Sequence, residues 1–239
     1  MDSVLTALIL GCQVGDELVF VPDKAPQTVL EDPHVYCIEC GGAGQTKIGN
    51  YDHHNTDEPL PPACIQACVF MKSDDPALLS LASYVAMIDT GKEVPERKII
   101  GQSLSSVFSG MRLVVKGASN QFRAGIEIFK TMLAHQVDVW QSMPLFPEWV
   151  SYNEAKNRQR RDLSDYQNKI IRFSTKTGLP GGFLSCPLPG VHGFLRMFGC
   201  RVSIAAGLQQ TGFRLCTIAG DCIRVDDLLK ALNVLERGW

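Results

Sequence analysis

The sequence predicts a two-domain α/β protein, in which a parallel-sheet domain is joined by a long helix to a smaller mixed α/β domain. Three observations support this prediction. Helix-like and strand-like segments alternate in the first half, which is typical of a mostly parallel sheet covered by helices. A long helical pattern follows over residues 148–174. After it, short strand-like runs are separated by glycine-containing turns.

The length of the chain fits this division. Its 239 residues can form one large domain or two smaller ones, with a sizeable core in either case. We expect the first domain over residues 1–150, a linking helix over 151–174 and the second domain over 175–239.

The elements of the first half follow from hydrophobic spacing and from proline and glycine positions. Apolar residues at helical spacing predict the helices, whereas β-branched runs that end at Pro22 or at Gly41 predict strands. The expected order is a helix over 3–13, strands over 16–23, 34–42 and 47–54, and helices over 61–73 and 75–91.

The second half begins with two long helical patterns, and the second of these is the linking helix. The stretch "TKTGLPGG" then marks a turn-rich break. The expected order is helices over 120–143 and 148–174, strands over 183–189, 200–209 and 212–220, and a last helix over 224–239.

Composition excludes several classes of protein. A formal net charge of −2 gives no overall field for nucleic acid or acidic membrane. No apolar run has the length of a membrane span, and the first residues lack the basic region of a signal peptide. Nine cysteines, an odd number in a long chain, favour reduced thiols. We therefore expect a cytoplasmic protein without membrane contact.

Four of these cysteines, at CxxC and CxxxC spacing, could hold structural zinc: Cys37, Cys40, Cys64 and Cys68. The first pair lies in a strand-like run, and an odd separation along a strand puts side chains on opposite faces. We therefore favour small buried hydrophobic side chains over a zinc site.

Acidic and histidine side chains close several apolar segments of the first half. Such a group is costly to bury unless it is paired or bound to a cation. In a parallel α/β sheet the carboxyl ends of the strands lie at one edge, so these side chains are expected to converge there. The set comprises Asp2, Glu39, Asp52, His53, His54 and Asp89. Carboxylates with imidazole suit a transition ion such as manganese better than calcium.

These segments resemble the DHH phosphoesterases. "YDHHNT" matches the motif that names the family, and "MDSVLTALIL" resembles the end of its first motif. "YCIECGG" stands where the family carries its second acid, and "AMIDTG" matches its late aspartate. The C-terminal stretch "GFRLCTIAGDCIRVDDLLKAL" resembles the DHHA1 substrate domain. The resemblance therefore implies a DHH domain followed by a DHHA1-like domain.

The resemblance implies a role for each matched residue. Asp2, Glu39, His53 and Asp89 would bind a metal ion, namely Mn²⁺, with Mg²⁺ or Co²⁺ as alternatives. Asp52 would orient a neighbouring imidazole, and His54 would contact the substrate phosphate. In the second domain the candidate substrate contacts are Arg214, Arg224 and His192, the last as a loop residue; surface positions are the alternative for each.

The sequence departs from the family in three respects, and one of them is that the family's glycine-rich loop with histidine would follow Trp239. The family has an aspartate where this chain has Glu39, which is one methylene longer. The family also has a histidine and an aspartate before the residue matched by Asp2, and these would precede Met1. A second metal site that shares Glu39 is therefore either completed by residues outside this sequence or incomplete.

The expected function is metal-dependent hydrolysis of a phosphate ester by metal-activated hydroxide. The substrate would be a small phosphate ester, a nucleotide or a short single-stranded oligonucleotide. The alternative is a degenerate relative that binds a nucleotide or partner without hydrolysis. A homodimer is compatible with either.

Overall fold

The computed structural model describes the chain except for residues 14, 55, 58, 92–100, 209–213 and 221–239. Within the described residues the protein is mixed α/β, so the predicted fold class is confirmed at that level. The chain divides into two compact units, residues 1–155 and 156–239. The division falls inside a single helix, α7 (Val150–Ser164).

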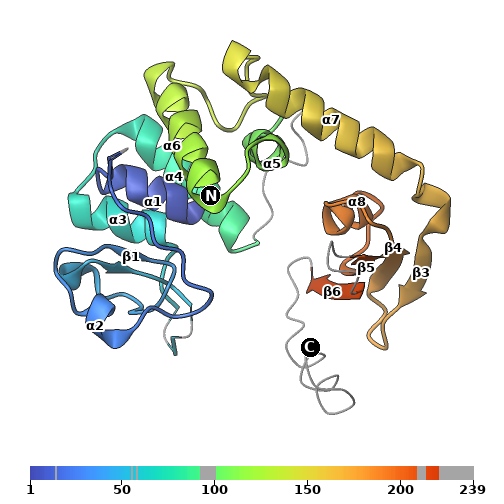
Figure 1. Cartoon of the computed structure of the whole chain (residues 1–239), viewed down its shortest axis with the longest axis horizontal. Coiled ribbons are helices and arrows are strands. Elements are labelled where there is room, and N and C mark those ends of the chain that lie inside the picture. Colours follow the sequence, from blue (N-terminus) through green and yellow to red (C-terminus); the bar gives the residue numbers. More distant parts are fainter. Residues whose placement is uncertain (14, 55, 58, 92–100, 209–213, 221–239) are drawn as a thin grey trace. The chain divides into compact units, whose positions relative to one another are not determined.

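The first unit is mainly helical and contains one short pair of strands (Figure 1). Its α-helices before α7 are α1 (Asp2–Ile9), α2 (Gln27–Leu30), α3 (Ala63–Met71), α4 (Pro76–Asp89), α5 (Leu104–Val114) and α6 (Ala118–Ala134). Its 3₁₀ turns are η1 (Thr46–Ile48) and η3 (Pro147–Trp149), and its strands are β1 (Cys37–Ile38) and β2 (Asn50–Tyr51).

Local sequence accounts for where these helices begin. Asp75 caps α4 by accepting a hydrogen bond from the Ala77 N–H, and Pro76 occupies the first helical position. Ser103 caps α5 in the same way. The predicted helices over 61–73 and 75–91 are therefore confirmed as α3 and α4, whereas α5 was not predicted.

The strands are shorter than predicted, and one is absent. β1 and β2 form a parallel pair in which Cys37 is opposite Asn50 and Ile38 is opposite Tyr51. β1 ends because Glu39 adopts a left-handed backbone with φ of 56°. The prediction of a strand over 16–23 is wrong, since this described segment is irregular. Its Val19 and Phe20 are exposed, so no neighbouring element buries the apolar run.

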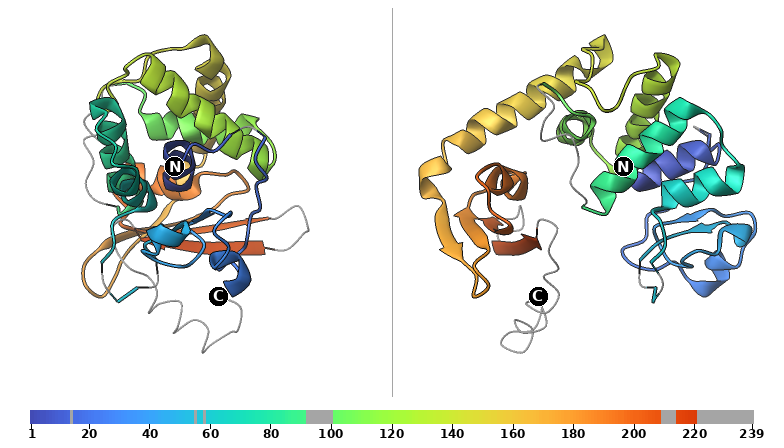
Figure 2. Two further views of the ribbon diagram at one scale, coloured as in Figure 1. Left: turned by 90° about the vertical axis from the view of Figure 1, so that its left-hand side faces the viewer. Right: turned by 180° about the vertical axis from the view of Figure 1, so that it is seen from behind.

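The core of the first unit lies among its helices. α1 packs against α3, α4 and α6, and the segment with β1 and β2 lies below these helices in Figures 1 and 2. The largest buried side chains include Tyr51, Tyr84, Phe129 and Trp149. This packing fixes the start of α1 and the end of α4 beside the carboxyl ends of β1 and β2.

The second unit is a four-stranded mixed sheet. Its strands lie in the order β3 (Ile171–Ser174), β4 (Pro180–Ser185), β5 (Val202–Leu208) and β6 (Arg214–Gly220). The β4–β5 pair is parallel, and the other two pairs are antiparallel. Helix α8 (Val191–Met197) connects the parallel strands, packs against both and shares a small core with Leu163 of α7.

Two predictions for this region are wrong. The linking helix was predicted to continue to residue 174, but α7 ends at Ser164. The 3₁₀ turn η4 (Gln167–Lys169) and strand β3 follow it. His192 is not a loop residue but lies in the first turn of α8. The predicted strands over 200–209 and 212–220 correspond to β5 and β6.

No helix in the described part of the chain combines the length and apolar content needed to cross a bilayer.

Candidate metal centre

Strand pairing brings the second acid and the histidine motif together. Because Ile38 is opposite Tyr51, Glu39 and Asp52 leave the parallel pair side by side at its carboxyl end. The Glu39 N–H donates to the Tyr51 carbonyl at 2.9 Å, which continues the pairing by one bond. His53 and His54 follow directly, so all four side chains start within a small volume.

The side chains converge with those of two helices. His53 Nε2 lies 2.9 Å from Asp89 Oδ2, at the end of α4, and 3.5 Å from Glu39 Oε2. His54 Nδ1 lies 3.0 Å from the same Glu39 oxygen. Two groups of ligand atoms result, each with all atoms within 4.8 Å of one another: Glu39, His53 and His54 in one, and Asp2, His53 and Asp89 in the other.

Asp2 also has a structural role. Its carboxylate is buried and accepts hydrogen bonds from the N–H groups of Ala63 at 2.9 Å and Cys64 at 2.8 Å. Pro62, which precedes α3, has no side chain that could cap the helix. Asp2 therefore caps α3 from the start of α1, and its remaining lone pairs face the group with His53 and Asp89.

Asp52 holds the motif loop in shape. Its Oδ2 accepts the Gly41 N–H at 2.6 Å, and its Oδ1 accepts the His54 N–H at 2.8 Å and lies 3.0 Å from His54 Nδ1. Burial by itself raises the pKa of Asp52, but these donors lower it below the ordinary value. Asp52 is therefore an ionised group that orients the imidazole of His54.

Glu39 and Asp89 have the opposite electrostatic environment. Burial, then the nearby charges of Asp2, Asp52 and Asp89, raise the pKa of Glu39 to about 9. Burial and Asp2 also raise the pKa of Asp89, although His53 and His54 act in the other direction. Without a cation, the cluster holds more carboxylates than its surroundings stabilise as anions.

The donor set fits a divalent cation. Glu39 Oε1 is a buried oxygen without a hydrogen-bond partner, whereas His53 Nε2 contacts the carboxylate of Asp89. An unpaired buried polar atom costs free energy, and a cation would satisfy it. Carboxylate oxygens with imidazole nitrogen are suitable ligands for Mn²⁺. Glu39, His53, Asp89 and Asp2 are therefore the residues that could hold the ion, and His54 is within reach of the same position.

Two expectations about side-chain direction are wrong. Continued strand alternation through the histidine motif would turn His53 and His54 to opposite faces, yet their ring centroids are 4.2 Å apart. It was also expected to separate Cys37 from Cys40, yet the two side chains pack in the same small apolar cluster. The reason is the same in both cases. β1 ends at Ile38 and β2 ends at Tyr51, so the period of two does not extend to these residues.

The four cysteines considered for zinc do not form a site. Cys37 and Cys40 lie beside α2, whereas Cys64 and Cys68 lie in the helical core. Among the described residues, no group with metal-ligand geometry includes a cysteine. Cys37, Cys64 and Cys68 are buried, as expected for small apolar side chains, whereas Cys40 is only partly buried.

The candidate substrate residues of the second domain belong to a separate unit. His192 is in α8 and contacts Ser203 and Thr217. Arg214 is the first residue of β6 and pairs with Leu208. Arg224 lies outside the described residues.

Sequence reasoning missed Gln66 of α3. Its Nε2 donates to the Asp52 carbonyl at 2.9 Å and to the Pro61 carbonyl at 2.7 Å, which ties the motif loop to the helix. The signal was present in the sequence, because Gln66 is the single polar residue within "ACIQACVFM".

The cluster therefore has ligands of the expected chemistry, a supporting carboxylate in Asp52 and a partly exposed imidazole in His54, whose side chain is 56% exposed. Known proteins add nothing to this description: no family model matches the chain, and neither curated proteins nor solved structures contain a match.

Proposed function

We propose that the protein is a metal-dependent phosphoesterase of DHH type that hydrolyses a small phosphate ester, a nucleotide or a short single-stranded oligonucleotide. One observation carries this proposal: residues from four segments of the chain form two overlapping groups of ligand atoms, namely Asp2, Glu39, His53 with His54, and Asp89. The buried oxygen Glu39 Oε1, which has no hydrogen-bond partner, supports a cation as the occupant of this cluster.

The residues of the cluster have different proposed roles, which follow from their contacts. Glu39, His53, Asp89 and Asp2 would hold Mn²⁺, which when bound supplies a Lewis acid and lowers the pKa of water. Asp52 fixes the ring of His54 through Oδ1. With Nδ1 donating to Asp52, the exposed Nε2 of an imidazolium ring would donate to a phosphate oxygen, where negative charge develops during hydrolysis.

Glu39 bears on the alternative of a relative that binds without hydrolysis. Glutamate is one methylene longer than the aspartate of the family, so its carboxylate would be displaced unless the backbone compensates. Glu39 does adopt a left-handed backbone, and its Oε2 reaches both imidazoles. This observation favours the catalytic proposal.

The test is hydrolysis of bis(p-nitrophenyl) phosphate by the full chain with Mn²⁺ or with a chelator. We expect activity with Mn²⁺ alone. His53→Ala should lose metal affinity and activity together. His54→Ala should retain Mn²⁺ but lose about 10²–10³-fold in kcat, the usual effect of removing one donor to a developing charge.

His34→Ala is the matched control, because His34 is exposed and belongs to neither ligand group. Metal affinity is measured in parallel by calorimetry. Binding of Mn²⁺ without hydrolysis of any phosphate ester would favour the non-catalytic alternative. Absence of Mn²⁺ binding would refute both.

A further inference from the structure

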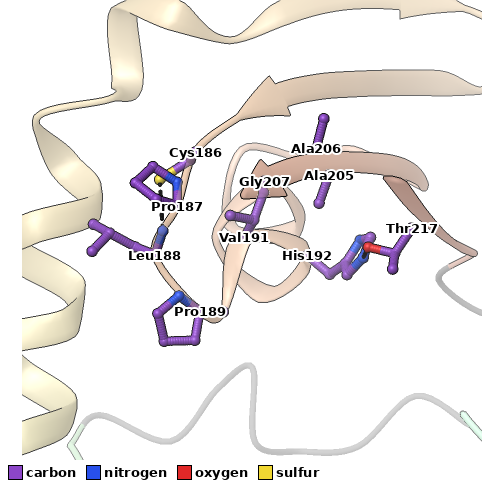
Figure 3. Close-up of a pocket in the computed structure, with 11 residues that line it drawn as sticks. Cys186, Pro187, Leu188, Pro189, Val191, His192, Ala205, Ala206, Gly207 and Thr217 are labelled. Atoms are coloured by element: carbon purple, nitrogen blue, oxygen red, sulfur yellow. Dashed lines mark hydrogen bonds between the residues drawn. The ribbon is translucent and has the colours of Figure 1, made fainter. Parts of the chain in front are cut away.

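The second unit contains a pocket that the proposed metal chemistry does not use. It has a volume of about 290 Å³ and lies between the loop that follows β4, the first turn of α8 and the facing positions of β5 and β6 (Figure 3). Ligand pockets in proteins usually measure about 300–1,000 Å³. This pocket therefore suits a single ring system rather than a large ligand.

The lining of the pocket carries no ionised side chain. Prolines and small residues form most of it, including Pro187, Pro189, Ala206 and Gly207. The titratable nitrogen base among the lining residues is His192, and burial, then the charge of Arg196, lower the pKa of its ring. The pocket is therefore suited to an uncharged group and unsuited to a phosphate.

The polar side chains of the pocket form a chain of hydrogen bonds whose direction can be assigned. Ser203 Oγ lies 3.2 Å from the Ala219 carbonyl, which can only accept, so Ser203 donates its proton there. Ser203 must then accept from His192 Nδ1, at 2.8 Å. The neutral ring consequently accepts at Nε2, and Thr217 Oγ1, also at 2.8 Å, donates to it.

This assignment fixes what Thr217 offers to a ligand. Its one proton is directed to His192, whose ring lies beside Thr217 in Figure 3. Its lone pairs take no donor from the described residues. Thr217 therefore presents an acceptor, and both nitrogens of His192 are already engaged.

We propose that this pocket binds an uncharged nitrogen heterocycle of nucleobase size, and that Thr217 accepts a hydrogen bond from an N–H group of that ring. This inference rests on the proposed function for its physiological meaning. It narrows the substrate to a nucleotide or oligonucleotide whose base carries an amino group. Binding of the ring itself requires neither metal nor phosphate.

The pocket is held in shape without a ligand. Gln159 Nε2 donates to the Pro189 carbonyl at 3.0 Å and fixes the loop. Gly207 lets β5 approach this loop, since a Cβ at that position would lie 2.8 Å from the Cys186 carbonyl oxygen. Binding to a preformed pocket costs less free energy than binding to a pocket that must first become ordered.

The test compares adenosine with purine riboside, which lacks only the exocyclic amino group, in a chelator with the full chain. Equilibrium dialysis should show that adenosine binds about two- to tenfold more tightly, the contribution of one neutral hydrogen bond. Thr217→Val, which has nearly the same shape, should bind both nucleosides equally. Thr217→Ser, the matched control, should keep the preference.

A second measurement on the unaltered protein guards against a variant that does not fold. Saturation-transfer NMR should mark the base protons of adenosine more strongly than its ribose protons. The proposal is overturned if adenosine does not bind, if the two nucleosides bind equally, if the preference persists in Thr217→Val, or if the ribose protons receive the larger effect.

These outcomes are separable from failure of the proposed function. Nucleosides contain no phosphate and the assay contains no metal, so loss of Mn²⁺-dependent hydrolysis would leave nucleoside binding unchanged. Conversely, hydrolysis of an aryl phosphate without discrimination between the nucleosides would refute this inference alone.

Discussion

Glu39 is a candidate metal ligand, and without a metal ion it is also expected to lower the stability of the folded protein. Its pKa is raised to about 9 by burial and by three neighbouring aspartates. At pH 7.5 the unfolded chain carries an ionised Glu39, whereas the metal-free folded chain must take up a proton. A raised carboxyl pKa therefore lowers folded stability in this pH range.

We accordingly predict opposite effects for Glu39→Gln with and without metal. In a chelator the variant should unfold at a higher temperature than the unaltered chain, because a buried ionisable group is removed. With Mn²⁺ it should gain less stability, because a charged ligand is lost. Thermal unfolding at pH 7.5, with and without Mn²⁺, measures both effects. A variant that is less stable in the chelator would contradict the electrostatic description.

His192 carries a second prediction at the residue scale. Its pKa is lowered by burial, then by Arg196, so the neutral ring is the folded form. A depressed pKa contributes stability that is present above the ordinary value of about 6.5 and is lost as the pH falls through the lowered value. Protonation also removes the Nε2 acceptor that Thr217 uses.

We therefore expect hydrogen exchange in α8, β5 and β6 to accelerate as the pH falls below about 6.5, after correction for the intrinsic exchange rate. In His192→Gln, which does not titrate, this acceleration should be absent. Peptides from α1 and α3 provide the internal control, because these helices belong to the other unit. An equal pH response in the variant would show that another group is responsible.

At the scale of elements, α3 depends on a cap from a distant part of the chain. Asp2 accepts from two N–H groups at the start of α3. Hydrogen bonds to a charged acceptor contribute about 1.5–3 kcal/mol. We predict that Asp2→Ala lowers the free energy of unfolding by about that amount in a chelator, and that Asp2→Asn, which keeps one acceptor oxygen, lowers it less.

Urea unfolding followed by tryptophan fluorescence measures this loss, because Trp149 lies in the core of the first unit and Trp140 packs against it. The chelator separates the capping role from any role in metal binding. If Asp2→Ala and Asp2→Asn were as stable as the unaltered chain, the two hydrogen bonds would contribute nothing.

The elements also show which parts of the structure the sequence could predict. α3 and α4 were predictable because proline, an aspartate cap and apolar spacing mark their ends. Convergence of the acids and histidines on one place was predictable in outline from strand ends. β1 and β2 have only two residues each, so alternation could not predict where Cys40, His53 and His54 point.

Other features depend on contacts that a linear pattern does not contain. The left-handed Glu39 ends β1 one residue after Ile38, and nothing in "YCIECGG" except the following glycines indicates a turn so early. Helix α8 has seven residues and three of its side chains are buried by the sheet, so tertiary packing rather than helical periodicity determines it.

The whole molecule has two units with separate cores, and only the first contains the candidate metal centre. A ligand stabilises the structure to which it binds, by about 2.7 kcal/mol at a concentration 100 times its dissociation constant. Because Asp2, Glu39, His53 and Asp89 join α1, the strand pair and α4, this stabilisation should appear in the first unit.

We therefore predict that Mn²⁺ slows hydrogen exchange in α1, α3 and α4 and leaves β3 to β6 unchanged. His53→Ala should abolish the effect, and His34→Ala should preserve it. Equal protection of both units would contradict a site confined to the first, and protection that survives in His53→Ala would place the ion elsewhere.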